Sequence, residues 1–214
     1  IVRGEGSDFC SGLDVKSVMS KPVNSVKLLF KWLPGASNLA QRVTTGWRDL
    51  PVPVIFAIEG RCWGGGLQIA LGGDFRFATA DSSWSIMENR WGLIPDMGGT
   101  LAFKELMRLD TALEMAMTAK EISGEQAKEA GLVSHITNEP LTAANELANQ
   151  LCQRSPDANA AIKKLYYKSW WSGQRSALFR EFYYQIRNLM GKNQKISVQR
   201  ELNKDSKKAF LSRR

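Results

Sequence analysis

The segment from Pro51 to Leu71 constrains the fold more than any other part of the sequence. It opens with an apolar, β-branched run ending at Ile58, continues through the glycines Gly64–Gly66, and closes on the apolar turn 67–71. This pattern predicts a strand buried on both faces, a bend without side chains, and a short helix that starts at the bend. Backbone N–H groups at a helix N-terminus lack helical partners, and glycine, which has no Cβ, lets a ligand oxygen approach them. The bend is therefore either an anion or oxyanion site, or a tight turn that packs the helix against the strand.

The sequence around this segment alternates strands with short helices. Strands are expected at 75–78 and 84–87, and helices at 38–50 and 100–109. A short helix is also expected to open at Asp14. The regular long helices of a doubly wound sheet are missing from this pattern, so we expect an α/β fold of another kind.

From residue 110 the pattern is mostly helical. A buried segment is expected over 113–117, a capping box at Ser123 opens a helix that ends at Gly131, and a short strand follows at 132–136. Four further helices are expected at 142–154, 156–171, 174–190 and 195–210. The aromatic residues between 166 and 184 exceed what a solvated helix needs, so we expect them to pack against the body or another subunit. His135 is the only histidine, and we interpret it as structural.

The net charge of +8 is concentrated near the C-terminus. Residues 155–214 carry 14 Lys or Arg against four Asp or Glu, which leaves a net charge of −2 for residues 1–154. A basic tail on a near-neutral body indicates a solvated face, a flank that faces phosphate groups, or an RNA-binding arm. We favour the first two and do not expect a nucleic-acid partner.

The three cysteines, Cys10, Cys62 and Cys152, form neither a CxxC pair nor a metal-binding cluster. This usage suits a reducing compartment, so we expect a cytoplasmic protein without a metal, or a mitochondrial or peroxisomal one in a eukaryote. No apolar run approaches the roughly 18 residues of a transmembrane helix, so no membrane partner is expected. The chain opens on Ile1 rather than Met, and we expect a first element or targeting segment to precede it.

Three motifs, at residues 9–14, 64–66 and 92–99, each contain a glycine bend. Two separated bends that each offer a backbone N–H are what the stabilisation of a developing thioester enolate requires. With these motifs the chain resembles the crotonase, or enoyl-CoA hydratase/isomerase, superfamily over essentially its whole length. The resemblance implies a ββα spiral core over residues 1–140, without the family's opening strands and first helix. It also implies a C-terminal helical region over residues 141–214 that carries trimer contacts and completes the coenzyme pocket.

The resemblance assigns the first two motifs to an oxyanion hole. The N–H groups of Leu13 and Gly65 are expected to hold the thioester oxygen of an acyl-CoA substrate. Coenzyme A is then part of the substrate and no separate cofactor is expected. The assembly implied by the family is a homotrimer or a hexamer.

Residues from both ends of the chain are implied in coenzyme binding. The Ser11 carbonyl is expected to face the adenine, and Asp14, in the same motif, belongs to the expected set. Lys207, Lys208 and Phe210 resemble the basic and aromatic residues that the family places near the adenine and its 3′-phosphate. These phosphate contacts would explain the basic tail without a nucleic acid.

The family's hydratases place two glutamates around the reactive carbons, at the positions of Gln68 and Glu88 here. A carboxamide cannot act as a general base near neutral pH, although it can orient water or substrate. Glu88 remains as the expected acid/base, and Asp96 is a second candidate, at a position where dienoyl-CoA isomerases of the family carry an aspartate. One carboxylate, its pKa raised by burial, can move a proton between two carbons, so the resemblance favours double-bond isomerisation.

Alternatives stay open at this point. Without the family, Glu88 and Asp96 would be ordinary loop acids. Within it, the same fold supports hydrolysis, dehalogenation and decarboxylation as other enolate chemistry. The chain could instead be a catalytically weak crotonase-like protein whose basic tail binds RNA.

Overall fold

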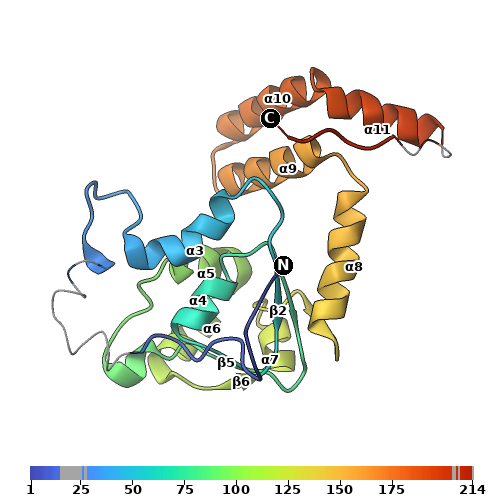
Figure 1. Cartoon of the computed structure of the whole chain (residues 1–214). Helices are drawn as coiled ribbons and strands as arrows, with labels where there is room; N and C mark the ends of the chain where they lie inside the picture. Colours follow the sequence, from blue (N-terminus) through green and yellow to red (C-terminus); the bar gives the residue numbers. More distant parts are fainter. Residues whose placement is uncertain (15–25, 27, 204–205, 207, 214) are drawn as a thin grey trace. The chain divides into compact units, whose positions relative to one another are not determined.

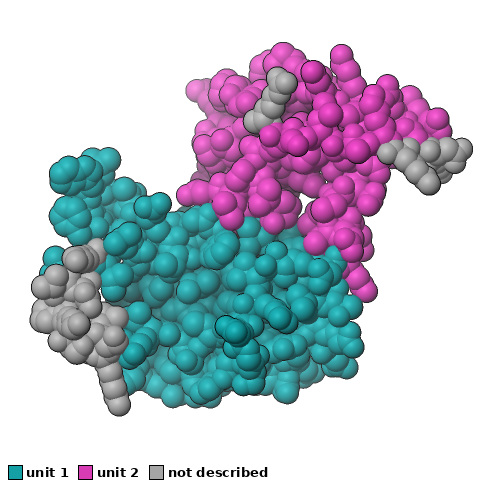
Figure 2. Space-filling model, in the orientation of Figure 1, with its two compact units in different colours: residues 1–48, 54–145 teal, residues 49–53, 146–214 magenta. Residues whose placement is uncertain are grey.

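The computed structural model describes residues 1–14, 26, 28–203, 206 and 208–213, and divides the chain into two compact units. Unit 1 comprises residues 1–48 and 54–145, and unit 2 comprises residues 49–53 and 146–214 (Figure 2). The helix expected to open at Asp14 falls on residues outside the described ranges.

Unit 1 is built on a four-stranded parallel sheet with the order β1-β2-β4-β7. Its strands are β1 (Val2–Arg3), β2 (Ile55–Ile58), β4 (Phe75–Ala78) and β7 (His135–Ile136). All four residues of β2 are buried, as its unbroken apolar run predicts. The predicted start of this strand at Pro51 is wrong, because Pro51 and Pro53 have no N–H for a ladder and the strand begins only at Ile55.

A second sheet has three short strands, β3 (Arg61–Trp63), β5 (Ser83–Ser85) and β6 (Ile122–Ser123). β3 and β5 are parallel, whereas β5 and β6 are antiparallel. In chain order, β2 is followed by β3 and a helix, and β4 is followed by β5 and a 3-10 helix. This strand–strand–helix repeat, with consecutive strands in different sheets, is the predicted ββα spiral.

The α-helices of unit 1 begin near the predicted positions, whereas no helix was predicted over residues 88–91 (Figure 1). The helices are α3 (Leu39–Asp49), α4 (Gly65–Ala70), the 3-10 helix η1 (Glu88–Trp91), α5 (Gly99–Leu106), α6 (Leu109–Thr118) and α7 (Gly124–Glu129). The predicted capping box is confirmed: the Ser123 hydroxyl accepts from the Gln126 N–H at 3.2 Å, and the Gln126 side chain accepts from the Ser123 N–H at 2.9 Å. α5 packs against both α4 and α6.

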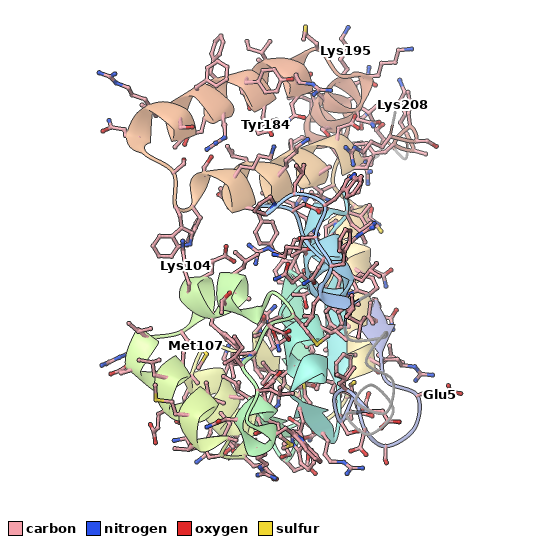
Figure 3. All side chains as sticks on the ribbon, turned by 90° about the vertical axis from the view of Figure 1, so that its left-hand side faces the viewer. Glu5, Lys104, Met107, Tyr184, Lys195 and Lys208 are labelled. Atoms are coloured by element: carbon pink, nitrogen blue, oxygen red, sulfur yellow. The ribbon has the colours of Figure 1, made fainter. Side chains whose placement is uncertain are left out.

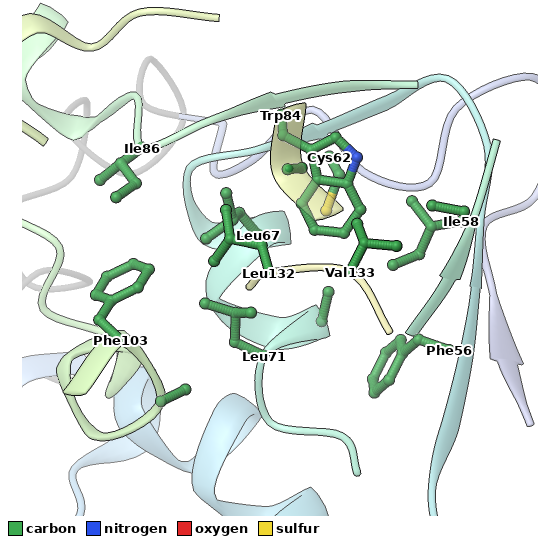
Figure 4. Close-up of a cluster of buried hydrophobic side chains, with 14 of the residues drawn as sticks. Phe56, Ile58, Cys62, Leu67, Leu71, Trp84, Ile86, Phe103, Leu132 and Val133 are labelled. Atoms are coloured by element: carbon green, nitrogen blue, oxygen red, sulfur yellow. The ribbon is translucent and has the colours of Figure 1, made fainter. Parts of the chain in front are cut away.

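The core of unit 1 lies between these helices and the two sheets (Figure 4). Its largest fully buried side chains include Phe56 from β2, Leu67 from α4 and Trp84 from β5. The expectation of a buried segment over 113–117 is only partly right, because Met115 is buried while Leu113 and Met117 are exposed. Residues two positions apart on a helix point in nearly opposite directions, so Met115 cannot share its face with either neighbour.

Unit 2 is helical. α8 (Pro140–Cys152) begins in unit 1 and ends in unit 2, and it is followed by α9 (Pro156–Ser169), α10 (Gln174–Leu189) and α11 (Lys192–Leu202). α9 begins as predicted, with the Ser155 hydroxyl accepting from the Ala158 N–H at 3.3 Å and Pro156 in the first turn. The predicted last helix, 195–210, is wrong at both ends: α11 starts earlier and stops before Asn203, whose backbone is extended. Asn competes with the helix by local hydrogen bonds, which favours an end at this point.

The aromatic side chains of α9 and α10 remain largely exposed, including Tyr166, Trp170, Phe179 and Phe182. Their packing against the body or another subunit stays a prediction. None of the helices in the described ranges is both long enough and apolar enough to cross a membrane.

Candidate active site

The segment that contains Leu13 reaches the glycine bend through a short strand-like contact. Cys10 forms a parallel bridge with Cys62 of β3, in which the Cys10 N–H donates to the Arg61 carbonyl at 2.9 Å. The Trp63 N–H donates in turn to the Cys10 carbonyl at 3.0 Å. The segments that follow Cys10 and Cys62 therefore lie side by side.

The backbone nitrogens of Leu13 and Gly65 lie close together beyond this bridge. A Cβ built on Gly65 would lie 3.7 Å from the Leu13 nitrogen, and a Cβ built on Gly12 would lie 3.7 Å from the Gly65 nitrogen. Gly65 is the first residue of α4, so its N–H has no helical partner. Two N–H groups that neighbour one another in this way can together donate to one anionic oxygen.

The glycine bend also has a packing role, as the tight-turn interpretation requires. A Cβ on Gly66 would lie 2.6 Å from both the Cβ and the carbonyl oxygen of Cys10. The N-terminus of α4 can therefore approach the Cys10 segment only because residue 66 has no side chain. The two interpretations of the bend are compatible, since close packing at Gly66 is what keeps the neighbouring Gly65 nitrogen near Leu13.

Gln68, on α4, is fully buried and makes three hydrogen bonds through its amide. Its Oε1 accepts from the N–H groups of Met97 at 2.9 Å and Gly99 at 3.0 Å, at the start of α5. Its Nε2 donates to Oε1 of Glu88 at 2.5 Å. The sequence signal for this triple contact was weak, because it joins residues from three separate segments.

Glu88, the first residue of η1, has a half-buried carboxyl group beside the glycine bend. A Cβ built on Gly64 would lie 3.7 Å from Glu88 Oε1. Glu88 Oε2 is buried and has no hydrogen-bond partner among the described residues. Burial raises the pKa of Glu88 above its ordinary value, and the charge of Asp96 adds to the rise, while the hydrogen bond from Gln68 opposes it. A carboxyl group with a raised pKa holds a proton more readily than an ordinary glutamate, which suits a group that accepts and returns one.

Asp96 is exposed on the loop between η1 and α5, near enough to act on Glu88 by its charge. Its own role in proton transfer stays a prediction. His135, interpreted as structural, is exposed and stacks on Phe77 with a ring separation of 4.8 Å. No group of three or more potential metal ligands occurs within the described ranges.

The expected coenzyme-binding residues are divided between the two units. Ser11 and Asp14 are exposed in unit 1, and Lys207 lies outside the described residues. In unit 2, the exposed Lys208 (Figure 3) donates to Gln199 Oε1 at 3.2 Å, and the Phe210 ring packs 4.8 Å from the Arg200 guanidinium.

A hollow of about 500 Å³ surrounds Phe210, and Arg154 and Arg200 line it together with Ser197 and Ser206. The two arginines were not singled out from the sequence, where nothing but the overall basic charge of the tail pointed to them. Glu201 also lines the hollow, 3.9 Å from Arg154, so its carboxylate offsets part of the positive charge.

An apolar hollow of about 610 Å³ lies in unit 1 between η1, α5 and α6. Asn89, the residue after Glu88, lines this hollow, and its apolar walls include Leu93, Phe103, Met107 and Leu113. Figure 3 shows Met107 and Lys104 at the C-terminal end of α5, on this side of the unit. The exposure of Leu113 and Met117, which the sequence did not predict, is accounted for by their position in this wall.

Comparison with known proteins identifies relatives of the whole chain. Residues 1–213 match the family model described as enoyl-CoA hydratase/isomerase. Carnitinyl-CoA dehydratases from Salmonella typhi and Salmonella agona are 38% identical to this chain over 120 residues, which is 55% of this chain and 46% of the relatives. The chain thus spans about half the length of the curated relatives that it matches.

Solved structures agree in fold. An enoyl-CoA hydratase from Polaromonas sp. JS666 has a TM-score of 0.82 at 26% identity, covering 94% of this chain and 77% of its own. An enoyl-CoA hydratase from Bacillus anthracis has a TM-score of 0.83 at 26% identity, covering 96% of this chain and 78% of its own. With a family model that matches nearly every residue and structures that share the ββα spiral, this chain belongs to the enoyl-CoA hydratase/isomerase family of the crotonase superfamily.

Proposed function

We propose that this protein binds an acyl-CoA and stabilises its thioester enolate with the N–H groups of Leu13 and Gly65. Glu88 removes a proton from the carbon next to the thioester and returns it to another carbon. The observation that carries this proposal is the carboxyl group of Glu88 beside the glycine bend, with a raised pKa and one buried oxygen that has no partner among the residues that the structure describes. A buried base that loses and regains a proton readily suits such a transfer.

The reaction we favour is isomerisation of a 3-enoyl thioester to a 2-enoyl thioester. Glu88 takes a proton from C2, the electron pair moves into a dienolate held by the two N–H groups, and the same proton or its replacement is delivered to C4. Gln68 supports this choice over two-carboxylate hydration, because an amide cannot take the proton of a water molecule. The relatives named carnitinyl-CoA dehydratase keep hydration and dehydration of an acyl-CoA as the second candidate.

The apolar hollow beside η1 supports a thioester with an acyl chain. Ser11, Asp14 and Lys208 remain proposed contacts of the coenzyme. The basic residues of the tail would also suit RNA, but some of them already contact their own unit: Arg180 donates to the Lys168 carbonyl, and Arg187 donates to Tyr183. If the protein slowed the migration of RNA in gel electrophoresis and turned over no acyl-CoA, the alternative of a catalytically weak, RNA-binding protein would be favoured.

The proposal is tested by following both reactions with 3-enoyl-CoA and 2-enoyl-CoA substrates. Isomerisation raises the absorbance of the conjugated thioester, and hydration lowers it. Glu88→Gln should reduce kcat for isomerisation by about 10²- to 10⁴-fold, because it removes the acid/base. Glu129→Gln, an exposed carboxylate on α7, is the matched control and should retain wild-type rates.

Deuterium placed at C2 of the substrate distinguishes the mechanisms further. A single shielded carboxyl group should carry part of the label to C4 of the product, whereas exchange through water would lose all of it. Equal rates for wild type and Glu88→Gln in both assays would show that the assignment of Glu88 is wrong.

A further inference from the structure

The Gln68 amide has its orientation fixed by its surroundings. Two backbone N–H groups, from Met97 and Gly99, face one atom of the amide, and only the carbonyl oxygen can accept from both. The amide nitrogen must therefore face Glu88, as observed. No other rotamer of the amide would satisfy all three partners.

The hydrogen bonds of Gln68 leave little capacity for any other partner. Its carbonyl oxygen already accepts two hydrogen bonds, which uses both lone pairs, and the side chain is 0% exposed. A water molecule or substrate therefore finds no free acceptor on this residue. The amide acts on Glu88 instead.

The two oxygens of Glu88 consequently differ. Oε1 is held by the Gln68 amide at 2.5 Å, while Oε2 is buried and has no hydrogen-bond partner in the part of the chain that the structure describes. We propose that Gln68 is a positioning residue that holds Glu88 Oε1 and thereby leaves Oε2 as the atom that exchanges protons with the substrate. This inference rests on the proposed role of Glu88 as the acid/base.

The Gln68 contact also reaches the loop that follows η1. The acceptor that binds Met97 and Gly99 fixes the start of α5, and the donor of the same amide fixes the carboxylate. One buried side chain therefore fixes the position of Glu88 relative to the loop that follows η1. The titratable group that acts on Glu88 from this loop is Asp96, whose negative charge favours the protonated form of Glu88.

Substitution of Gln68 can separate these two contacts. Gln68→Glu keeps an oxygen that accepts from Met97 and Gly99 but can donate to Glu88 only while its own carboxyl group is protonated. Gln68→Met removes both and is close in size. If Gln68 were merely structural, Gln68→Met should lower the melting temperature without moving the acidic limb of the kcat profile.

The positioning role predicts a different outcome. Both variants should lower kcat by about ten- to a hundredfold, the equivalent of one hydrogen bond to a charged group, with KM within about twofold. The acidic limb of the kcat profile should move to higher pH, because Glu88 loses a hydrogen bond that favours its ionised form. In Gln68→Glu the introduced carboxylate adds a like charge, and the two groups titrate as a pair.

Carbon-13 NMR of labelled glutamate carboxyl groups provides a readout that does not depend on turnover. The Glu88 signal is assigned by its loss in Glu88→Gln, and its midpoint is followed in wild type and in Gln68→Met, with thermal melting as a check on folding. A higher midpoint in Gln68→Met supports the inference. An unchanged midpoint together with an unchanged acidic limb would overturn it. If the wild type has no acyl-CoA turnover, the proposed function fails, while the NMR titration still decides whether Gln68 holds Glu88.

Discussion

The contact between Gly66 and Cys10 allows the packing of the site to be tested by adding one methyl group. In Gly66→Ala the new Cβ would lie 2.6 Å from the Cys10 carbonyl oxygen, 2.6 Å from its Cβ and 2.9 Å from its Sγ. Two of these three atoms, the carbonyl oxygen and the Cβ, cannot swing away by a side-chain rotation. α4 and the Cys10 segment must therefore move apart.

The size of the effect follows from two opposing terms. Overpacking of this kind typically costs about 1–3 kcal/mol. Alanine is favoured over glycine within a helix by about 1 kcal/mol. Because α4 is short and buried, we expect the packing cost to dominate, with a net loss of up to about 2 kcal/mol in the free energy of unfolding. For a chain of this length, each kcal/mol corresponds to a Tm change of about 2–4 °C.

Gly46→Ala is the matched control for this change. Gly46 lies within α3, and a Cβ built on it meets nothing within 4 Å. The same substitution should therefore stabilise the protein by about 0.5–1 kcal/mol there. Both variants are compared by urea unfolding and by the isomerase assay, in which Gly66→Ala should lose activity because Gly65 moves away from Leu13. A Gly66→Ala protein as stable as Gly46→Ala would refute the reasoning.

Two further predictions follow from the burial of Glu88 and from the exposed aromatic face of unit 2. Because the folded-state pKa of Glu88 is raised above its ordinary value of 4.5, its stability contribution is fully present below that pH and is lost as pH rises through the folded pKa. Glu88→Gln should therefore melt at a higher temperature than wild type at pH 8, and this difference should vanish below about pH 4.5; a lower melting temperature at pH 8 would contradict the sign. We also propose that the aromatic residues on α9 and α10 are covered in a homotrimer, so light scattering should give a mass three times the 23.9 kDa of one chain. Phe179→Glu and Phe182→Glu together should lower that mass, and a wild-type mass of one chain at micromolar concentration would count against the trimer.

Local signals in the sequence predicted the local structure well. The glycines of 64–66 predicted the start of α4, and Ser123 with Gln126 predicted the start of α7, because turn and cap chemistry depends on a few neighbouring residues. The strand at 75–78 was found from the alternation of apolar and polar residues along it. The predicted limits of the strand at Pro51 and of the helix at 195–210 were wrong. Apolar or helix-forming composition extends beyond the residues whose backbones are hydrogen-bonded in the strand or helix.

The candidate site was predictable only in part. The resemblance placed Leu13 and Gly65 in one oxyanion hole, and the structure brings their nitrogens together. It did not indicate that the Gln68 side chain would donate to Glu88, because that contact depends on how α4 and η1 pack. The exposure of Leu113 and Met117 was missed for a related reason: hydrophobic residues that line a hollow have the same composition as residues that fill a core.

We expect the β-bridge that pairs the backbones of Cys10 and Cys62 to form late in folding, and the site with it. Leu13 and Gly65 come from distant parts of the chain, and only the pairing of these two short segments brings their nitrogens together. Closing so long a loop has an entropic cost that local helices do not share. During refolding, far-ultraviolet circular dichroism should therefore recover before activity does. The recovery of activity would then measure the completion of the whole spiral, and the circular dichroism signal would measure the formation of its separate helices.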